Sequence, residues 1–210
     1  MKIESFYQRL RGFNFKFRHP SHYPIKKISN KKFVFIHINK TGGTSINSAL
    51  GIIKKHLTAK EVIDLVGKKN FSKVFSFAVV RNPWDKVASQ YHHRIRTQQI
   101  NESISFNSWV SKTYGNHKDL TYHDKPYKMF YPQIEWLKDY SGEIVVNKIM
   151  RFEKLNEEYE SIRKALSVNK KLPHKNKSSN YDYKTIYSDN SIEIVKEHFK
   201  EDIELFGYDF

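Results

Sequence analysis

A short glycine loop between a strand pattern and a helix pattern constrains this fold most. Residues 33–38 are mostly apolar, which is typical of a buried parallel strand. The loop at residues 40–45, KTGGTS, follows, and Ile46, Ala49 and Leu50 then begin a helical pattern. Glycines let backbone N–H groups approach a ligand, and a helix N-terminus favours negative charge. The segment therefore predicts an anion cradle.

The side chains of this loop suit a phosphate-like anion. Lys40 adds a mobile cation. Hydroxyl donors and glycines fill the other positions: Thr41, Gly42, Gly43, Thr44 and Ser45. The order differs from a Walker A loop, whose lysine follows the glycines. A glycine pair by itself also fits a purely geometric turn, but the lysine and the hydroxyls favour anion binding.

Composition indicates one folded domain that attracts anions. The chain has 210 residues, of which 39% are hydrophobic, enough for the core of one domain. Its formal net charge of +15 draws anionic partners electrostatically. The absence of cysteine excludes disulfides, zinc–thiolate sites and thiol catalysis. No apolar run reaches the ~20 residues that span a bilayer.

The first 31 residues show no clean period and are interpreted as a basic N-terminal arm, followed by a single domain at residues 32–210. The arm lacks the apolar core of a signal peptide. We therefore expect a cytoplasmic protein, whose basic arm could also contact a membrane surface.

Strand and helix patterns alternate along the rest of the chain. Strands are predicted at residues 33–38, 71–80 and 143–150. Helices are predicted at residues 46–50, 58–66, 84–95, 155–166 and 192–203, the first ending at Gly51 and the second starting with a Thr58–Glu61 capping box. This alternation predicts an α/β, P-loop-like three-layer fold with a mainly parallel central sheet flanked by helices.

A second candidate segment, RNPWDKVASQY at residues 81–91, follows the second predicted strand. Arg81 lies where a parallel strand ends, the edge at which α/β proteins bind ligands. Pro83 suits a helix start, and Ser89 lies about two turns along that helix. An arginine fork and a hydroxyl suit a phosphate monoester. Taken alone, the segment fits a capping arginine and a surface serine better.

Together the two segments resemble the two nucleotide signatures of the sulfotransferases that use 3′-phosphoadenosine 5′-phosphosulfate (PAPS). They are most similar to the carbohydrate (type 2) sulfotransferase family. The resemblance continues in RFEKL at residues 151–155, LPHKN at residues 172–176 and DIELFGY at residues 202–208. It covers the chain from about residue 33 to the C-terminus.

The resemblance implies an enzyme that transfers a sulfuryl group from PAPS to a carbohydrate hydroxyl and releases 3′-phosphoadenosine 5′-phosphate (PAP), with no metal. Residues 40–45 would hold the 5′-phosphosulfate, with Lys40 also near the leaving oxygen. Arg81 and Ser89 would hold the 3′-phosphate. A basic loop would close over the nucleotide through Lys175, Asn176 and Ser178. Many relatives have proline where this chain has Asn39, a change in loop stiffness.

His56 is the candidate catalytic base, since similar carbohydrate sulfotransferases carry a catalytic histidine in a comparable segment. It follows the expected helix stop at Gly51, so the chain could return it towards the loop. In an unbroken helix it would lie about 18 Å away along the axis. The alternative is an exposed or capping histidine. His92 and His93 are the next candidates, and His37 is expected to pack within or beside the sheet.

The acceptor implied is a polar or anionic glycan, placed at residues 101–133. Trp109, Tyr114 or Tyr122 could stack on sugar rings or could equally belong to the core, and His123 and His174 could contact acceptor or nucleotide. Two rival functions are a nucleotide-dependent kinase and a basic polyanion-binding module. No motif that reads RNA or DNA is present, so no specific nucleic acid is expected. The sequence indicates no oligomeric state.

Overall fold

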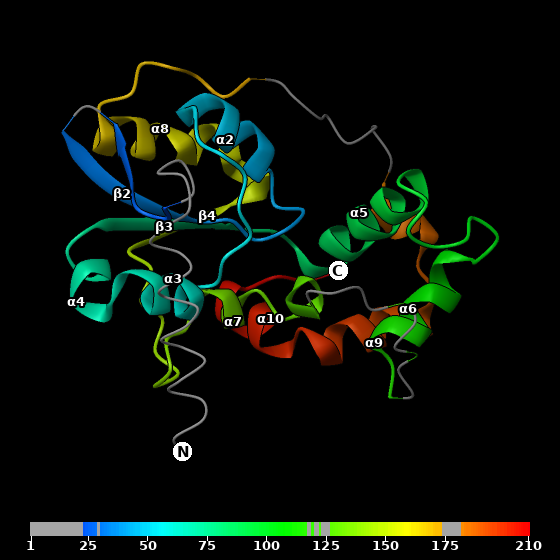
Figure 1. Ribbon diagram of the computed structural model, residues 1–210. Coiled ribbons are helices and arrows are strands. Elements are labelled where there is room, and N and C mark those ends of the chain that lie inside the picture. The colour runs from blue at the N-terminus through cyan, green and yellow to red at the C-terminus, as the bar shows by residue number, and fades with distance from the viewer. Residues whose placement is uncertain (1–22, 29, 117–118, 120–121, 123–126, 174–181) are drawn as a thin grey trace.

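The computed structural model is an α/β structure with helices on both faces of one sheet (Figure 1). The structure describes residues 23–28, 30–116, 119, 122, 127–173 and 182–210. The sheet has the order β1-β2-β3-β4. Its strands are β1 (Lys26–Ile28), β2 (Lys31–Ile36), β3 (Phe75–Val80) and β4 (Lys148–Arg151).

Strand pairing confirms the mainly parallel sheet. β2 pairs with β3 and β3 with β4 in parallel, with Phe33 opposite Phe75 and Phe77 opposite Lys148. β1 pairs antiparallel with β2. Because β1 lies within the predicted arm, the sheet begins before residue 32 and the boundary expected at residue 31 falls inside it. Residues 1–22 of the arm lie outside the described residues.

Helices cover both faces of the sheet, because successive side chains of a strand point to opposite sides. Phe33 and Phe77 face α2 (Gly43–Leu50) and α8 (Leu155–Leu166). Their sequence neighbours Val34 and Ala78 lie in a second cluster with side chains of α3, α4 and α7. These three helices span Ala59–Val66, Lys68–Phe71 and Ile134–Leu137.

A group of helices packs beside the sheet (Figure 1). It consists of α5 (Pro83–Arg96), α6 (Phe106–Tyr114), α9 (Asp189–His198) and α10 (Lys200–Phe206). Among the described residues, short 3₁₀ helices also occur at η3 (Tyr127–Phe130), η4 (Phe152–Lys154) and η5 (Tyr183–Ile186). Trp109 is fully buried and Tyr114 only 4% exposed in the core of this group. Both therefore belong to the core, and the alternative that they stack on a sugar is wrong.

Two predicted strands are shorter than expected. Residues 68–71 form α4, so β3 starts at Phe75 rather than at residue 71. Residues 143–147 precede β4 without joining its ladder. There the Asn147 side chain accepts hydrogen bonds from the Ser76 N–H at 2.8 Å and the Ser76 hydroxyl at 2.9 Å. A side chain thus occupies the place of a ladder partner. The last predicted helix is divided into α9 and α10 at Phe199.

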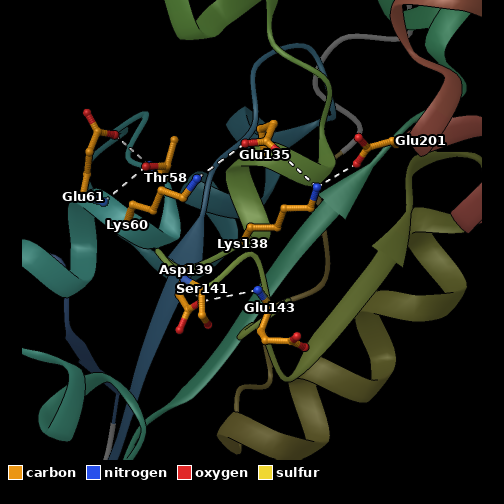
Figure 2. A network of polar contacts seen from close by, with 9 residues as sticks. All are labelled: Thr58, Lys60, Glu61, Glu135, Lys138, Asp139, Ser141, Glu143 and Glu201. Atoms are coloured by element: carbon orange, nitrogen blue, oxygen red, sulfur yellow. Dashed lines mark hydrogen bonds and ion pairs between the residues drawn. The ribbon is translucent and has the colours of Figure 1, made fainter.

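A polar network ties α3 to α7 and α10 (Figure 2). Glu135 of α7 accepts from Lys60 at 3.5 Å and from Lys138 at 2.9 Å. Lys138 also pairs with Glu201 at 2.7 Å. The predicted capping box at Thr58 and Glu61 is confirmed at the start of α3. The box fixes the start of α3 and so the path of the segment that carries His56.

Candidate active site

The loop at residues 40–45 has the backbone of an anion cradle. Gly42 has φ +80°, and a Cβ there would lie 2.8 Å from the Leu155 side chain. A Cβ at Gly43, where α2 begins, would lie 2.0 Å from Nε2 of His37. Both positions therefore require glycine, because any side chain there would clash with Leu155 or His37. The N-terminus of α2 lies at the end of this loop, as the anion-binding interpretation needs.

The hydroxyl groups of the loop differ in what they can do. The Thr41 hydroxyl donates to the Ile38 carbonyl at 3.0 Å, and the residue is fully buried. In this arrangement the hydrogen of the Thr41 hydroxyl holds the loop together, and binding of an anion by Thr41 stays a prediction. Thr44 is exposed, whereas Ser45 is 8% exposed and its N–H donates to the Gly42 carbonyl at 3.0 Å. Binding of an anion by the backbone N–H groups and by Thr44 stays a prediction.

Lys40 is the cation of the loop, and its surroundings weaken its hold on a proton. Burial lowers the pKa of Lys40 to about 8, helped by the positive charges of Arg81, Arg96 and Lys54. The charge of Lys54 also contributes to lowering the pKa values of His37, His56 and His93. Positive charge thus gathers around the loop. Sequence reasoning missed Lys54 and Arg96, whose only signal was the general excess of basic residues.

Arg81 joins the end of β3 to the loop. Its Nε and Nη2 each donate to the Asp85 carboxylate at 2.7 Å, and its Nη1 donates to the Lys40 carbonyl at 2.9 Å. The guanidinium lies 4.1 Å from the centre of the Phe152 ring, and Arg81 is only 4% exposed. Ser89 is half-buried on α5, four residues beyond Asp85 and so on the same helix face. Binding of a 3′-phosphate by Arg81 and Ser89 stays a prediction.

The backbone of Arg81 is held by a buried polar network. The side-chain amide of Gln133 accepts from the Arg81 N–H at 2.9 Å and donates to its carbonyl at 2.8 Å. The N–H groups of Gln133 and Ile134 donate to Asp202 at 2.7 and 2.8 Å. Asp202 and the neighbouring Lys86 are both fully buried, and their charges interact. Asp202 of the DIELFGY segment thus holds Gln133, which in turn holds the backbone of Arg81.

The RFEKL segment also supports the site structurally. Phe152 contacts the guanidinium of Arg81, and a Cβ at Gly42 would lie 3.0 Å from its ring. Glu153 accepts from the Asn82 N–H at 2.6 Å and from the Tyr208 hydroxyl at 3.2 Å. The segment therefore connects the glycine loop, the start of α5 and the C-terminal residues.

His56 has the tautomer that a catalytic base needs. Its Nδ1 lies 2.8 Å from the backbone carbonyl oxygen of His37. A carbonyl oxygen can only accept, so Nδ1 carries the hydrogen and the neutral ring has a free lone pair on Nε2. Burial lowers the pKa of His56 to about 4, opposed by this hydrogen bond and helped by Lys54 and Lys128. The ring is therefore neutral at neutral pH.

His37 links His56 to the loop. The centres of the His37 and His56 rings lie 4.3 Å apart, and the Phe35 ring stacks on His37 with its centre 5.2 Å away. His37 is 3% exposed, and burial, followed by the charges of His56 and Lys54, holds its pKa far below the usual range. The prediction that His37 packs beside the sheet is confirmed.

The other candidate bases are less suitable. The Nδ1 of His93 lies 3.3 Å from Nη2 of Arg96. Arginine can only donate, so the neutral His93 ring carries its hydrogen on Nε2 and has no lone pair left for a substrate proton. His92 is exposed on α5. The remaining candidates from the sequence lie outside the described residues: His123, His174, Lys175, Asn176 and Ser178.

A metal site was not expected from the sequence. In the described part of the chain, no group of three or more histidine, aspartate or glutamate side chains could hold a metal ion. The described helices include none that is long and apolar enough to cross a membrane.

Comparisons with known proteins agree with this architecture. A model of the sulfotransferase family matches residues 25–209. The crystal structure of a sulfotransferase from Alicyclobacillus acidocaldarius is similar, with a TM-score of 0.50 and 15% sequence identity. The match covers 87% of this chain and 98% of that protein, and it supports the fold. No curated protein matches the chain.

Proposed function

Because the chain belongs to the sulfotransferase family and is an enzyme that transfers sulfuryl groups, we propose that its donor is PAPS and its acceptor a carbohydrate hydroxyl. The residues of the loop fit such a donor. The glycines at 42 and 43 let the loop pack closely against Leu155 and His37, and Lys40 supplies a positive charge in the same loop. The N-terminus of α2 adds backbone N–H donors.

The proposed reaction is an in-line displacement at sulfur. The acceptor oxygen forms a bond to sulfur while the bond from sulfur to the 5′-phosphate oxygen breaks, and the electron pair of that bond stays on PAP. Lys40 stabilises the charge that develops on the leaving oxygen. The Nε2 of His56 takes the proton of the acceptor hydroxyl, a contribution of about 10²–10⁴-fold in rate. Positioning and electrostatics account for the rest.

The observation that carries this proposal is the position of His37 between loop and base. Its ring occupies the space against Gly43, and its carbonyl accepts the hydrogen of His56 Nδ1. One residue therefore supports both the anion cradle and the lone pair that would accept a proton. A loop that only bound an anion would not need a histidine with a fixed tautomer beside it.

The charges around the loop support a polar or anionic acceptor. The charges of Lys54 and Arg96 lower the pKa of Lys40, and those of all three lower the pKa of His93. A carbohydrate with carboxylate or sulfate groups would gain from these charges, whereas a neutral apolar alcohol would not. We therefore expect turnover with acidic glycans to exceed turnover with phenols or steroids.

Binding of PAP against adenosine 5′-monophosphate, measured by calorimetry, tests the donor. We expect at least tenfold tighter binding of PAP, with the preference lost in Arg81→Ala. Release of PAP from PAPS, measured with panels of acidic glycans, neutral glycans and phenols, then tests the acceptor. The variant His56→Ala should bind PAP like the wild type and release little of it during turnover. Equal affinity for the two nucleotides would refute the choice of donor.

A further inference from the structure

We propose that Asp85 is a positioning residue which, through Arg81, fixes the backbone of Lys40 in the loop. The proposal deepens the proposed function, on which it rests for the identity of the donor. Neither sequence signature assigned a role to Asp85. The structure places it in direct contact with Arg81, whose Nη1 donates to the carbonyl of Lys40, the residue that would act on the leaving oxygen.

The backbone of Lys40 needs an external restraint. Its φ is +64°, in the left-handed region that costs free energy for any residue except glycine. The surrounding structure must therefore hold it there. The Nη1 of Arg81, which follows the neighbouring strand β3, donates to the Lys40 carbonyl at 2.9 Å. The conformation of Lys40 thus depends on where the guanidinium lies.

Asp85 determines where the guanidinium lies. Its two carboxylate oxygens accept from Nε and Nη2 at 2.7 Å each, so the pair is bidentate. Phe152 covers one face of the same group at 4.1 Å. The carboxylate sets the plane of the guanidinium and leaves Nη1 directed at the loop. Arg81 is 4% exposed and the Asp85 side chain 19%, so water competes weakly with this pair.

Charge leads to the same role. The positive charge of Arg81 helps to lower the pKa of Lys40, because it disfavours the charged ammonium. Two cations so close together repel each other, and a carboxylate on the far side of the guanidinium reduces that repulsion. Asp85 therefore allows Arg81 to reach the Lys40 backbone without driving the ammonium away.

A different role for Asp85 makes the opposite prediction. If the carboxylate only occupied the guanidinium in the absence of nucleotide, its removal would free Arg81 for a phosphate group. Binding of PAP would then become tighter. If Asp85 positions Lys40 through Arg81, its removal must weaken binding and lower kcat. The sign of the change separates the two roles.

The experiment compares Asp85→Asn, Asp85→Ala, Arg81→Lys and the double variant Asp85→Asn/Arg81→Lys. We expect Asp85→Asn, which keeps the shape of the side chain, to weaken PAP binding about fivefold and to lower kcat about tenfold. Asp85→Ala should show larger losses. The double variant should lose little more than Arg81→Lys alone, because both changes break one chain of contacts. The control is Glu160→Ala, which removes a 2.6 Å ion pair between Glu160 and Arg163 on α8. It should leave kcat and PAP binding unchanged.

A measurement without nucleotide keeps this proposal separate from the choice of donor. Labelling of amines by an acylating reagent, read by mass spectrometry, gives the pH at which Lys40 is half-reactive. In the wild type we expect this pH near 8, since burial lowers the pKa of Lys40 to about that value. In Asp85→Asn it should fall, because the charge of Arg81 then acts on the Lys40 ammonium without an offsetting carboxylate, while the labelling of Lys164 on α8 stays the same.

Two results would overturn the role of Asp85. One is tighter or unchanged PAP binding with unchanged kcat in both Asp85 variants. The other is an unchanged labelling profile of Lys40 in Asp85→Asn while the protein stays folded by circular dichroism. If instead the labelling shifts but the wild type binds PAP and adenosine 5′-monophosphate equally, the donor is wrong and the positioning role stands.

Discussion

Replacing Gly43 with alanine tests the contact that joins the glycine loop to the candidate base. The added Cβ would lie 2.0 Å from Nε2 and 2.1 Å from Cδ2 of His37. Carbon atoms in contact are ordinarily about 3.5–4.0 Å apart. The ring would have to move by about 1.5 Å, but it is 3% exposed and packed against the rings of Phe35 and His56. We therefore expect the loop or the His37–His56 pair to shift.

The cost can be worked out in sign as well as size. Inserting a methyl group into a packed site costs about 1–3 kcal/mol. Alanine in a helix otherwise gains up to about 1 kcal/mol over glycine. Gly43→Ala should thus lower the free energy of unfolding by about 1–2 kcal/mol. Displacement of a catalytic group by about 1 Å can cost 10²-fold in rate, so kcat should fall by about that factor.

Urea unfolding and PAP release measure the two effects, and two further variants act as controls. Gly51→Ala changes a glycine at the other end of α2, where φ is +63° and a Cβ would meet nothing within 4 Å. It should cost about 1–2 kcal/mol by backbone strain alone and leave kcat unchanged. In a His37→Ala background, Gly43→Ala should no longer destabilise, because the ring that it meets is absent. A Gly43→Ala variant as stable and as active as the wild type would refute the reasoning.

The remaining predictions concern charge. The rate of transfer should fall as pH drops through about 4, where His56 becomes protonated, and should fall again as pH rises through about 8, where Lys40 loses its proton. Lys40→Arg should move the alkaline limb upward, because the guanidinium stays charged, and a pH–rate profile of both proteins checks this. Asp202→Ala should lower the free energy of unfolding by about 3–5 kcal/mol, because it leaves the buried Lys86 ammonium without its counter-charge. Urea unfolding measures that loss, and a change below 1 kcal/mol, similar to that of the exposed Glu201→Ala, would contradict it.

Local sequence patterns were enough to predict the elements that carry the loop. The apolar run ending at Ile38, the glycine pair and the Thr58–Glu61 capping box each follow from neighbouring residues, and the structure has a strand, a loop and two helices there. The end of the first helix at Gly51 was predicted for the same reason, since glycine adopts the left-handed conformation found there. The strand predicted at residues 143–150 starts only at Lys148, because the side chain of Asn147 accepts the hydrogen bond that a backbone carbonyl would otherwise accept.

The sequence by itself determined which residues lie at the ends of parallel strands, and therefore that Lys40 and Arg81 belong to one edge of the sheet. Tertiary structure alone decided what those residues contact. The contacts of Asp85 with Arg81, of Phe152 with Gly42, and of His37 with Gly43 and His56 join residues 4 to 110 positions apart along the chain. Strand and helix patterns report local conformation, whereas the partner of a side chain and the tautomer of a histidine depend on atoms that only folding brings together.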